Sequence, residues 1–312
     1  MKYLAFDFGG TFVKAAVIEG EEILLKWKDQ APLKSKEDFH DYIAAKYEAY
    51  ADGIDGIAIS MPGIIDPVTG YAYRAGSYKK LAETNIYELL GDIPCKVAVE
   101  NDGKAATLAE LVSGKLKGAE TGAVITIGTG LGGGIVTNGK LLRGSHFAAG
   151  EITGFLLEPG NYSMEGCAAL SGGMTGFLLH VARAKGMDAS EFEVSDNFVE
   201  NPQERIKKYG GKEVLQWVKE NDPVTSEVYH KWIEKLIMII LNLQITLDTE
   251  KILIGGGISQ NEMFLSDLKA EYKKAGESLS IYRRFNATID SCQYREDANL
   301  LGAVYNYQSL YE

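Results

Sequence analysis

The sequence has few cysteine and proline residues. Its 312 residues include three cysteines and seven prolines. Cys95, Cys167 and Cys292 lie far apart and form no Cys-x-x-Cys pair, so the pattern excludes a disulfide framework and a cysteine-rich zinc site. Long apolar runs are also absent. The longest, 236–247, is interrupted by polar residues, is too short to span a bilayer, and predicts a helix buried in a core or in a dimer contact.

Basic residues are outnumbered as well. Lys and Arg total 32 against 43 for Asp and Glu, so the formal net charge is −11. This charge is a poor match for a nucleic-acid backbone or an anionic membrane surface. Asp7 interrupts the first apolar stretch, so no secretory signal is predicted. We therefore expect a cytoplasmic protein without nucleic-acid or membrane partners.

Glycine, in contrast, is abundant, and it gathers in three clusters beside apolar segments. The 35 glycines include those of 4–18 and 123–136, each of which predicts two strands joined by a glycine turn. A third cluster, 255–257, follows the predicted strand 251–254. An ordinary tight turn explains any one cluster. Three clusters beside strands favour phosphate or nucleotide binding, because glycine lets a ligand approach the backbone closely.

Between the two hairpins, helical and strand patterns alternate, which predicts an α/β fold. Helices are expected over 36–50, 85–90, 103–113, 227–248 and 297–307, strands over 56–60 and 96–99, and short surface helices within the polar stretch 186–226.

Two domains are expected, because the chain has about twice the length of a typical domain and 46% of it is apolar. We predict a small α/β domain over residues 1–117, joined by the closing helix at about 297–312. A large α/β domain is predicted over residues 118–296. The chain length and the apolar run 236–247 favour a homodimer.

The first glycine turn is a candidate phosphate and metal site. Its backbone N–H groups can face phosphate oxygens, Thr11 adds a hydroxyl donor, and Asp7 could hold magnesium directly or through water. The segment is neither a P-loop nor a Rossmann fingerprint, because the GxxxxGK[ST] pattern is missing and a strand follows it. Asp102, which lies between the predicted strand 96–99 and the predicted helix 103–113, can be interpreted as a helix N-cap or as a general base. Spacing alone leaves both roles open.

Six motifs together resemble the ROK family of bacterial sugar kinases, in the hexokinase–actin superfamily. They are DFGGTxxK (7–14), SMPGIID (60–66), VENDGKAA (99–106), IGTGLGGGI (127–135), AGEI (149–152) and LIGGGIS (253–259). They run in the family's order from the first strand to the last helix. The resemblance implies a two-domain actin-like ATPase (ribonuclease H-like) fold with a cleft between the domains. It also implies ATP and Mg²⁺ as cofactors.

The same resemblance implies roles for single residues. Asp102 matches the catalytic base. The residues that match sugar contacts are Pro62, Gly63, Asn101, Asp102, Glu151 and Glu165. Those that match nucleotide contacts are Asp7, Gly9, Gly10, Thr11 and Lys14 in the first phosphate loop, Thr129 and Gly130 in the second, and Gly255, Gly256 and Gly257 beside the adenosine.

The chain departs from the family's zinc motifs. The histidine that commonly follows AGE is absent from 152–154, and of the CxCGxxGCxE segment only Cys167 remains. One alignment places Ala169 at that motif's glutamate; we prefer the other, which places Glu165 there. Because a tetrahedral zinc site needs four ligands, we predict no zinc, a buried Cys167 thiol and a structural role for His146.

The expected activity is transfer of the γ-phosphoryl group of ATP to the 6-hydroxyl of glucose or a β-glucoside. Loss of the zinc-site histidine would open the anomeric end of the sugar pocket. Fructose, mannose and N-acetylhexosamines are alternative sugars. The family's repressors carry an added helix-turn-helix, which we do not expect here because the chain begins at the kinase strand. A non-catalytic sugar-sensing regulator and an actin-like ATPase are the alternative functions.

Overall fold

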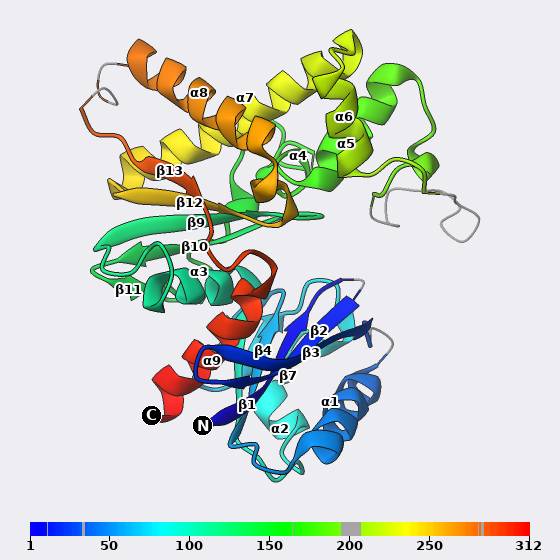
Figure 1. Ribbon diagram of the computed structural model, residues 1–312, viewed down its shortest axis with the longest axis vertical. Helices are drawn as coiled ribbons and strands as arrows, with labels where there is room; N and C mark the ends of the chain where they lie inside the picture. The colour runs from blue at the N-terminus through cyan, green and yellow to red at the C-terminus, as the bar shows by residue number, and fades with distance from the viewer. Residues whose placement is uncertain (11, 33–34, 164, 195–206, 280, 282–283) are drawn as a thin grey trace. The chain divides into compact units, whose positions relative to one another are not determined.

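The computed structural model describes residues 1–312 except 11, 33–34, 164, 195–206, 280 and 282–283 (Figure 1). The strands are β1 (Lys2–Phe8), β2 (Phe12–Glu19), β3 (Glu22–Gln30), β4 (Gly56–Met61), β5 (Ile64–Asp66), β6 (Tyr71–Arg74), β7 (Thr84–Asn85), β8 (Val97–Asn101), β9 (Thr121–Ile127), β10 (Leu131–Thr137), β11 (Lys140–Leu141), β12 (Lys251–Gly255) and β13 (Thr288–Ser291). The α-helices are α1 (Lys36–Tyr50), α2 (Ile86–Leu89), α3 (Asp102–Val112), α4 (Ala168–Ser171), α5 (Met174–Lys185), α6 (Gly211–Lys219), α7 (Pro223–Leu247), α8 (Glu262–Ser278) and α9 (Ala298–Tyr311).

The chain divides into two compact units. Unit 1 contains Met1–Glu120, Gly133–Gly150 and Gln293–Glu312, and unit 2 contains Thr121–Gly132 and Glu151–Cys292. Residues 133–150 and the last helix therefore group with the N-terminal segment.

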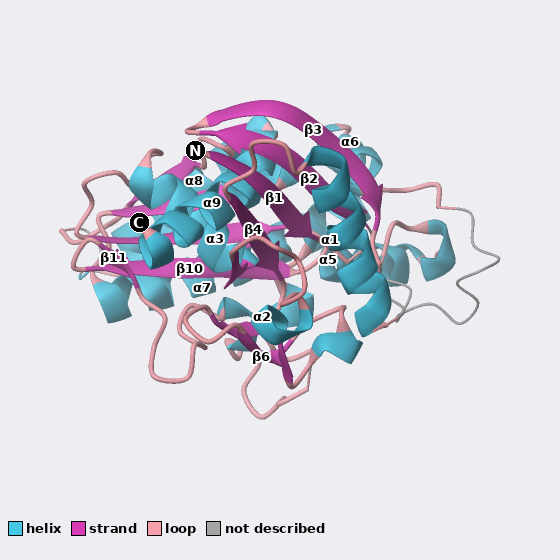
Figure 2. Ribbon diagram, turned by 90° about the horizontal axis from the view of Figure 1, so that it is seen from below, coloured by secondary structure: helices cyan, strands magenta, loops and turns pink. Residues whose placement is uncertain are grey.

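The first sheet belongs to unit 1 and has the strand order β3-β2-β1-β4-β8. Its strands β1, β4 and β8 run parallel, and successive side chains of a strand point to opposite faces. On β1, Phe6 and Phe8 pack on the face that α1 covers, whereas Tyr3 and Ala5 pack on the face of α3 and α9 (Figures 1 and 2). Every residue of β4 is buried, because both faces of the sheet are covered.

Small residues allow α9 to lie close to α3. A Cβ atom added at Gly302 of α9 would lie 1.7 Å from the carbonyl oxygen of Ala105 in α3. Since that oxygen belongs to the backbone, it cannot move aside without shifting the whole helix.

We therefore expect Gly302→Ala to lower the free energy of unfolding by about 1–3 kcal/mol, because the two helices must separate. Urea unfolding measures the change. Gly154→Ala is the matched control: an added Cβ there meets nothing within 4 Å, and the change should stay within about 0.5 kcal/mol. Equal stabilities for the two variants would contradict the close packing of α3 on α9.

The second sheet has the order β11-β10-β9-β12-β13, with β12 parallel to β9 and β13. In unit 2, α7 packs against α5, α6 and α8. The apolar run 236–247 lies in α7 and buries Leu236, Ile240 and Leu243, which confirms a helix with a buried face. No helix in the described ranges is long and apolar enough to cross a membrane.

A small sheet of unit 1 has the order β5-β6-β7. Ile64 of β5 pairs with Arg74 of β6, and Ile65 pairs with Ala72. Tyr73 is therefore an extra residue in β6, and the strand pair contains a β-bulge.

The structure confirms the helices expected over 36–50, 103–113 and 227–248, with shifts of a few residues at their ends. The stretch 186–226 lies partly outside the described residues; α6 and the 3-10 turn η3 (Ala189–Glu191) form in its described part. Strands β3, β6 and β13 and helix α5 were not predicted, whereas a helix was expected after the glycine cluster 255–257 and is α8.

Candidate active site

Polar residues meet at the carboxyl ends of the parallel strands of unit 1. Asp7, Ser60 and Glu100 occupy one row across β1, β4 and β8. Asp102 follows β8 directly as the first residue of α3. The carboxyl ends of parallel strands are where open α/β sheets bind ligands, so this edge is the candidate site in unit 1.

The structure decides one of the two roles that the sequence left open for Asp102, that of helix N-cap. Asn101 is the N-cap of α3, and its Oδ1 accepts the N–H of Lys104 at 3.0 Å. Asp102 is not the cap. Its Oδ1 accepts the N–H of Gly103 at 2.8 Å and Nδ2 of Asn101 at 3.1 Å. These two bonds hold the Asp102 carboxylate at the start of the helix.

The electrostatics of Asp102 suit proton transfer. Burial of the carboxylate raises its pKa above the usual value for aspartate, while the N–H of Gly103 and the charge of Lys104 act in the opposite direction. The residue as a whole is only half-buried, so it keeps access from solvent. A carboxylate with a raised pKa is a better proton acceptor near neutral pH than an ordinary aspartate.

Asp7 is a second buried carboxylate in the same unit. Its Oδ1 accepts Nδ2 of Asn299 at 2.9 Å, and Nζ of Lys14 lies 3.9 Å from its Oδ2. Burial raises the pKa of Asp7 to about 6, and the negative charge of Asp102 acts in the same direction.

A cation would stabilise the charge that burial disfavours at Asp7. Among the described residues, no group of three or more His, Cys, Asp or Glu side chains forms a metal site. A single carboxylate fits magnesium, which is commonly held by one or two carboxylates together with water and substrate phosphates.

The first glycine turn is closed by its own hydrogen bonds. The N–H of Gly9 donates to the carbonyl of Phe12 at 3.0 Å, and the Tyr78 hydroxyl donates to the carbonyl of Gly9 at 2.9 Å. The Gly9 N–H is therefore used within the hairpin, although we expected the N–H groups of this turn to face phosphate. A Cβ at Gly10 would lie 3.0 Å from Oγ of Ser77. Thr11 lies outside the described residues.

The Pro62–Gly63 turn is attached to the end of β8. Nδ2 of Asn101 donates to the carbonyl of Gly63 at 2.8 Å. Gly63 has φ +128°, and a Cβ there would lie 1.9 Å from the carbonyl oxygen of Arg74, so only glycine fits. Three predicted sugar contacts, Gly63, Asn101 and Asp102, are thus neighbours in the structure.

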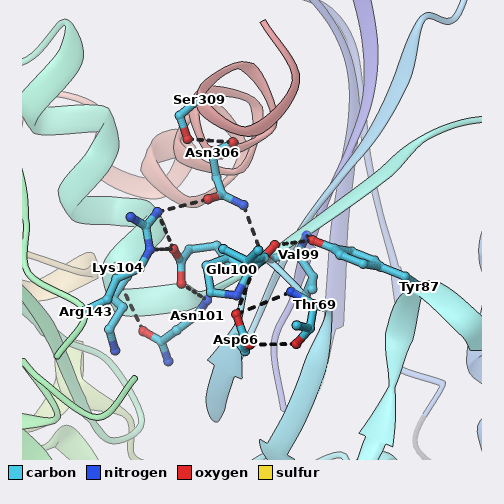
Figure 3. A network of polar contacts seen from close by, with 12 residues as sticks. Asp66, Thr69, Tyr87, Val99, Glu100, Asn101, Lys104, Arg143, Asn306 and Ser309 are labelled. Carbon is cyan, nitrogen blue, oxygen red and sulfur yellow. Dashed lines mark hydrogen bonds and ion pairs between the residues drawn. The ribbon is translucent and has the colours of Figure 1, made fainter. Parts of the chain in front are cut away.

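A buried ion pair that we did not predict supports this edge (Figure 3). Glu100 is completely buried, and its Oε2 lies 2.9 Å from both Nε and Nη2 of Arg143. Oε1 of Glu100 accepts the N–H of Asn101 at 2.8 Å, and Arg143 donates to Asn306 of α9 at 3.1 Å. Burial raises the pKa of Glu100 while Arg143 lowers it. The sequence holds no local signal for this pair, because 43 positions separate its members.

In unit 2, the predicted second phosphate loop rests on the start of α5. The N–H groups of Met174 and Thr175 donate to the carbonyls of Gly128 and Thr129 at 2.9 and 3.0 Å. A Cβ at Gly173 would lie 2.7 Å from Cα of Gly130, so the turn and the helix are in direct contact.

The third glycine cluster lies beside the end of β9. Gly255 ends β12, which is the parallel neighbour of β9. Gly256 has φ +83°, and a Cβ there would lie 2.1 Å from the carbonyl oxygen of Ile127. A Cβ at Gly257 would meet nothing within 4 Å. The two glycine segments predicted to bind nucleotide in unit 2 therefore lie at the same edge of the second sheet.

The predicted sugar carboxylates of unit 2 lie in loops. Half-buried Glu151 precedes the 3-10 turn η2 (Ile152–Gly154). Exposed Glu165 lines a cavity of about 410 Å³ together with Glu158, His180 and Arg183. Ala169, the alternative at this position, lies in α4.

The sulfur and histidine residues of the altered zinc region correct one expectation. Cys167 is half-buried and not the buried thiol that we expected. It is the N-cap residue of α4 and forms an isolated β-bridge with Leu156. His146 is exposed.

Comparisons with known proteins agree with the motifs. The ROK family model matches residues 3–309. The β-glucoside kinase of Listeria innocua is 30% identical over 319 residues, which cover 98% of this chain and 97% of that protein. The N-acetylmannosamine kinase of Haemophilus influenzae is 29% identical, with 98% of this chain and 95% of that protein covered.

A solved structure shows the same fold. The ROK family protein of Streptococcus pneumoniae in complex with sucrose superposes with a TM-score of 0.81 at 25% identity, covering 99% of this chain and 98% of that one. The likeness confirms the actin-like ATPase fold class. Because the family model spans almost the whole chain, the protein belongs to the ROK family.

Proposed function

We propose that this protein is an ATP-dependent sugar kinase that phosphorylates the 6-hydroxyl of a glucose-type sugar, with β-glucosides as the preferred class. The observation that carries the proposal is Asp102. Its carboxylate is held at the end of β8 by Gly103 and Asn101, and burial raises its pKa. The family membership and the β-glucoside kinase relative support the same activity.

Asp102 accepts the proton of the sugar 6-hydroxyl as the hydroxyl oxygen attacks the γ-phosphorus. The bond from that phosphorus to the β-γ bridging oxygen breaks, and ADP leaves. Asn101 orients the Asp102 carboxylate through a hydrogen bond. The hydrogen bond from Asn101 to the carbonyl of Gly63 keeps the Pro62–Gly63 turn beside the sugar that accepts the phosphoryl group. Phosphoryl transfer depends mainly on such positioning and on stabilisation of charge.

The glycine turns of unit 2 bind the nucleotide in this proposal. Thr129 and Gly130 contact phosphate oxygens, and Gly255, Gly256 and Gly257 lie against the adenosine. Magnesium held by Asp7 would neutralise charge on the phosphates. In unit 1, Lys14 is held near Asp7 by a hydrogen bond of 2.9 Å that its Nζ donates to the carbonyl of Glu296.

An N-acetylated hexosamine is the second candidate substrate. It is favoured by the Haemophilus influenzae relative, which is named N-acetylmannosamine kinase and is nearly as similar as the β-glucoside kinase. The two candidates share the reaction and the catalytic base, and they differ in the substituent that the sugar pocket accepts.

The test is ATP consumption with magnesium across glucose, methyl β-glucoside, cellobiose, N-acetylmannosamine and N-acetylglucosamine. We expect turnover with glucose or β-glucosides. Turnover only with an acetylated sugar would select the second candidate. ATP hydrolysis that is independent of sugar would favour an actin-like ATPase, and silence with every sugar would favour a sugar-sensing protein.

A further inference from the structure

Two aromatic rings lie parallel on the surface of unit 1. The ring centroids of Tyr73 and Phe147 are 6.2 Å apart, and the angle between the ring planes is 18°. The ring of Tyr71 meets Tyr73 edge-on at 4.9 Å. Although Tyr73 takes part in both contacts, it remains 48% exposed. The cluster therefore offers aromatic surface to solvent.

The backbone is irregular at both Tyr73 and Phe147. Tyr73 is the extra residue of the bulge in β6, and bulges redirect side chains near functional sites. Phe147 has φ +58°, a left-handed conformation that a bulky residue rarely adopts. Strain of this kind persists where the surrounding structure enforces it, and it is concentrated at ligand sites.

Both rings are connected to the end of β8 that carries Asp102. Tyr73 directly precedes Arg74, whose carbonyl lies against Gly63. The carbonyl of Gly63 in turn accepts a hydrogen bond from Nδ2 of Asn101. Phe147 lies in the loop that follows Arg143, which pairs with Glu100 (Figure 3). The N–H of Ala149 closes this loop by donating to the carbonyl of Arg143 at 3.2 Å. Two separate routes thus connect the segments that carry the rings to the proposed acceptor site.

We propose that Tyr73 and Phe147 form a platform for the aglycone of a β-glucoside, an inference that rests on the proposed function. The reacting glucose ring needs hydrogen bonds, which Asn101 and Asp102 supply. The ring pair supplies mainly aromatic faces, and the C–H groups of a sugar or the face of an aryl group pack on such surfaces. The 6.2 Å between the centroids leaves no space for a further ring between them, so the aglycone lies on their open faces. The platform therefore fits a sugar or aryl aglycone.

The test compares glucose, cellobiose and phenyl β-glucoside as acceptors. We expect Tyr73→Ala to lower kcat/KM for the two β-glucosides about tenfold through a higher KM, with less than about a twofold change for glucose. Phe147→Asn should act in the same way without disturbing the loop, because asparagine tolerates a positive φ. Tyr73→Phe keeps the aromatic ring, so its KM for the β-glucosides should stay close to that of the wild type.

Tyr50→Ala is the matched control, since Tyr50 belongs to another stacked pair of unit 1, with Trp27 at 4.9 Å and 23°. It should leave the ratio of cellobiose to glucose turnover unchanged. Equal losses for glucose and β-glucosides in Tyr73→Ala, or no loss for either, would overturn the platform while the kinase proposal stands. A wild-type enzyme that accepts glucose but no β-glucoside would also overturn it. Failure of the wild type with all three acceptors would reject this activity, and the platform with it.

Discussion

Replacement of Asp102 by asparagine is expected to reduce kcat by about a hundred- to ten-thousandfold. The amide cannot accept the proton of the sugar hydroxyl, although it has nearly the same shape as the carboxylate. Its Oδ1 can still accept the N–H of Gly103, so the local fold should persist. Sugar affinity should change little, because the reaction step and not the ground-state complex loses its base.

The measurement is steady-state turnover with glucose and cellobiose, combined with sugar binding by calorimetry. Asp7→Asn is an informative comparison, because it removes a carboxylate of the same unit that has no proton-accepting role in the proposal. Its loss should depend on the magnesium concentration, whereas the loss in Asp102→Asn should not. Near-normal turnover of Asp102→Asn would rule out Asp102 as the base.

The pH profile provides a further check on the same residue. Burial raises the pKa of Asp102, and only its ionised form can accept a proton. Activity should therefore fall as pH decreases through this raised pKa, above the usual range for aspartate. Asp102→Asn should lose the part of the acid limb that Asp102 contributes, and protonation of Asp7, whose pKa is about 6, accounts for the part that persists.

The second large effect is on stability. Arg143→Met should lower the free energy of unfolding by about 3 kcal/mol, because the completely buried Glu100 loses the guanidinium that pairs with it and keeps only the charge of Lys104. Loss of Arg143 also removes the charge that lowers the pKa of Glu100. Since protonation of Glu100 relieves the penalty, the loss should be larger at pH 8 than at pH 5.

Urea unfolding of Arg143→Met, Glu100→Gln and the double variant measures this coupling. The double variant should be less destabilised than the sum of the single variants, because the uncharged amide no longer needs a cation. Lys231→Met is the control: Lys231 pairs with Glu227 at 2.6 Å on the exposed face of α7 and should contribute no measurable stability. If the changes in unfolding free energy of the two single variants simply add in the double variant, Glu100 and Arg143 are not energetically coupled and the prediction is wrong.

Local patterns were sufficient for much of the first sheet and for its helices. The glycine hairpin of β1 and β2, helix α1 and the placement of Asp102 at the end of β8 all follow from residues close together in sequence. Apolar periodicity and glycine turns act over a few residues, so a single chain reveals them. Strand β3 was missed because its residues are largely exposed and show no buried face.

The motifs also determined the family, but they did not determine which residues cap and contact the candidate site. Asn101, and not Asp102, caps α3, because the cap depends on the direction of each side chain relative to the first turn of the helix. The burial of Cys167 likewise could not be derived from its residue type.

Only the tertiary structure brought Arg143 to Glu100 and Phe147 to Tyr73. Each pair joins segments that are far apart in sequence, and no periodicity connects them. Their contacts depend on which strands pair, where β6 bulges and how the loop after β11 folds back. The amino-acid sequence thus determined the type of protein and its candidate base. The pairing of distant strands and loops decided which side chains hold that base and which rings lie near it, because a side chain's partners depend on where the folded backbone places it.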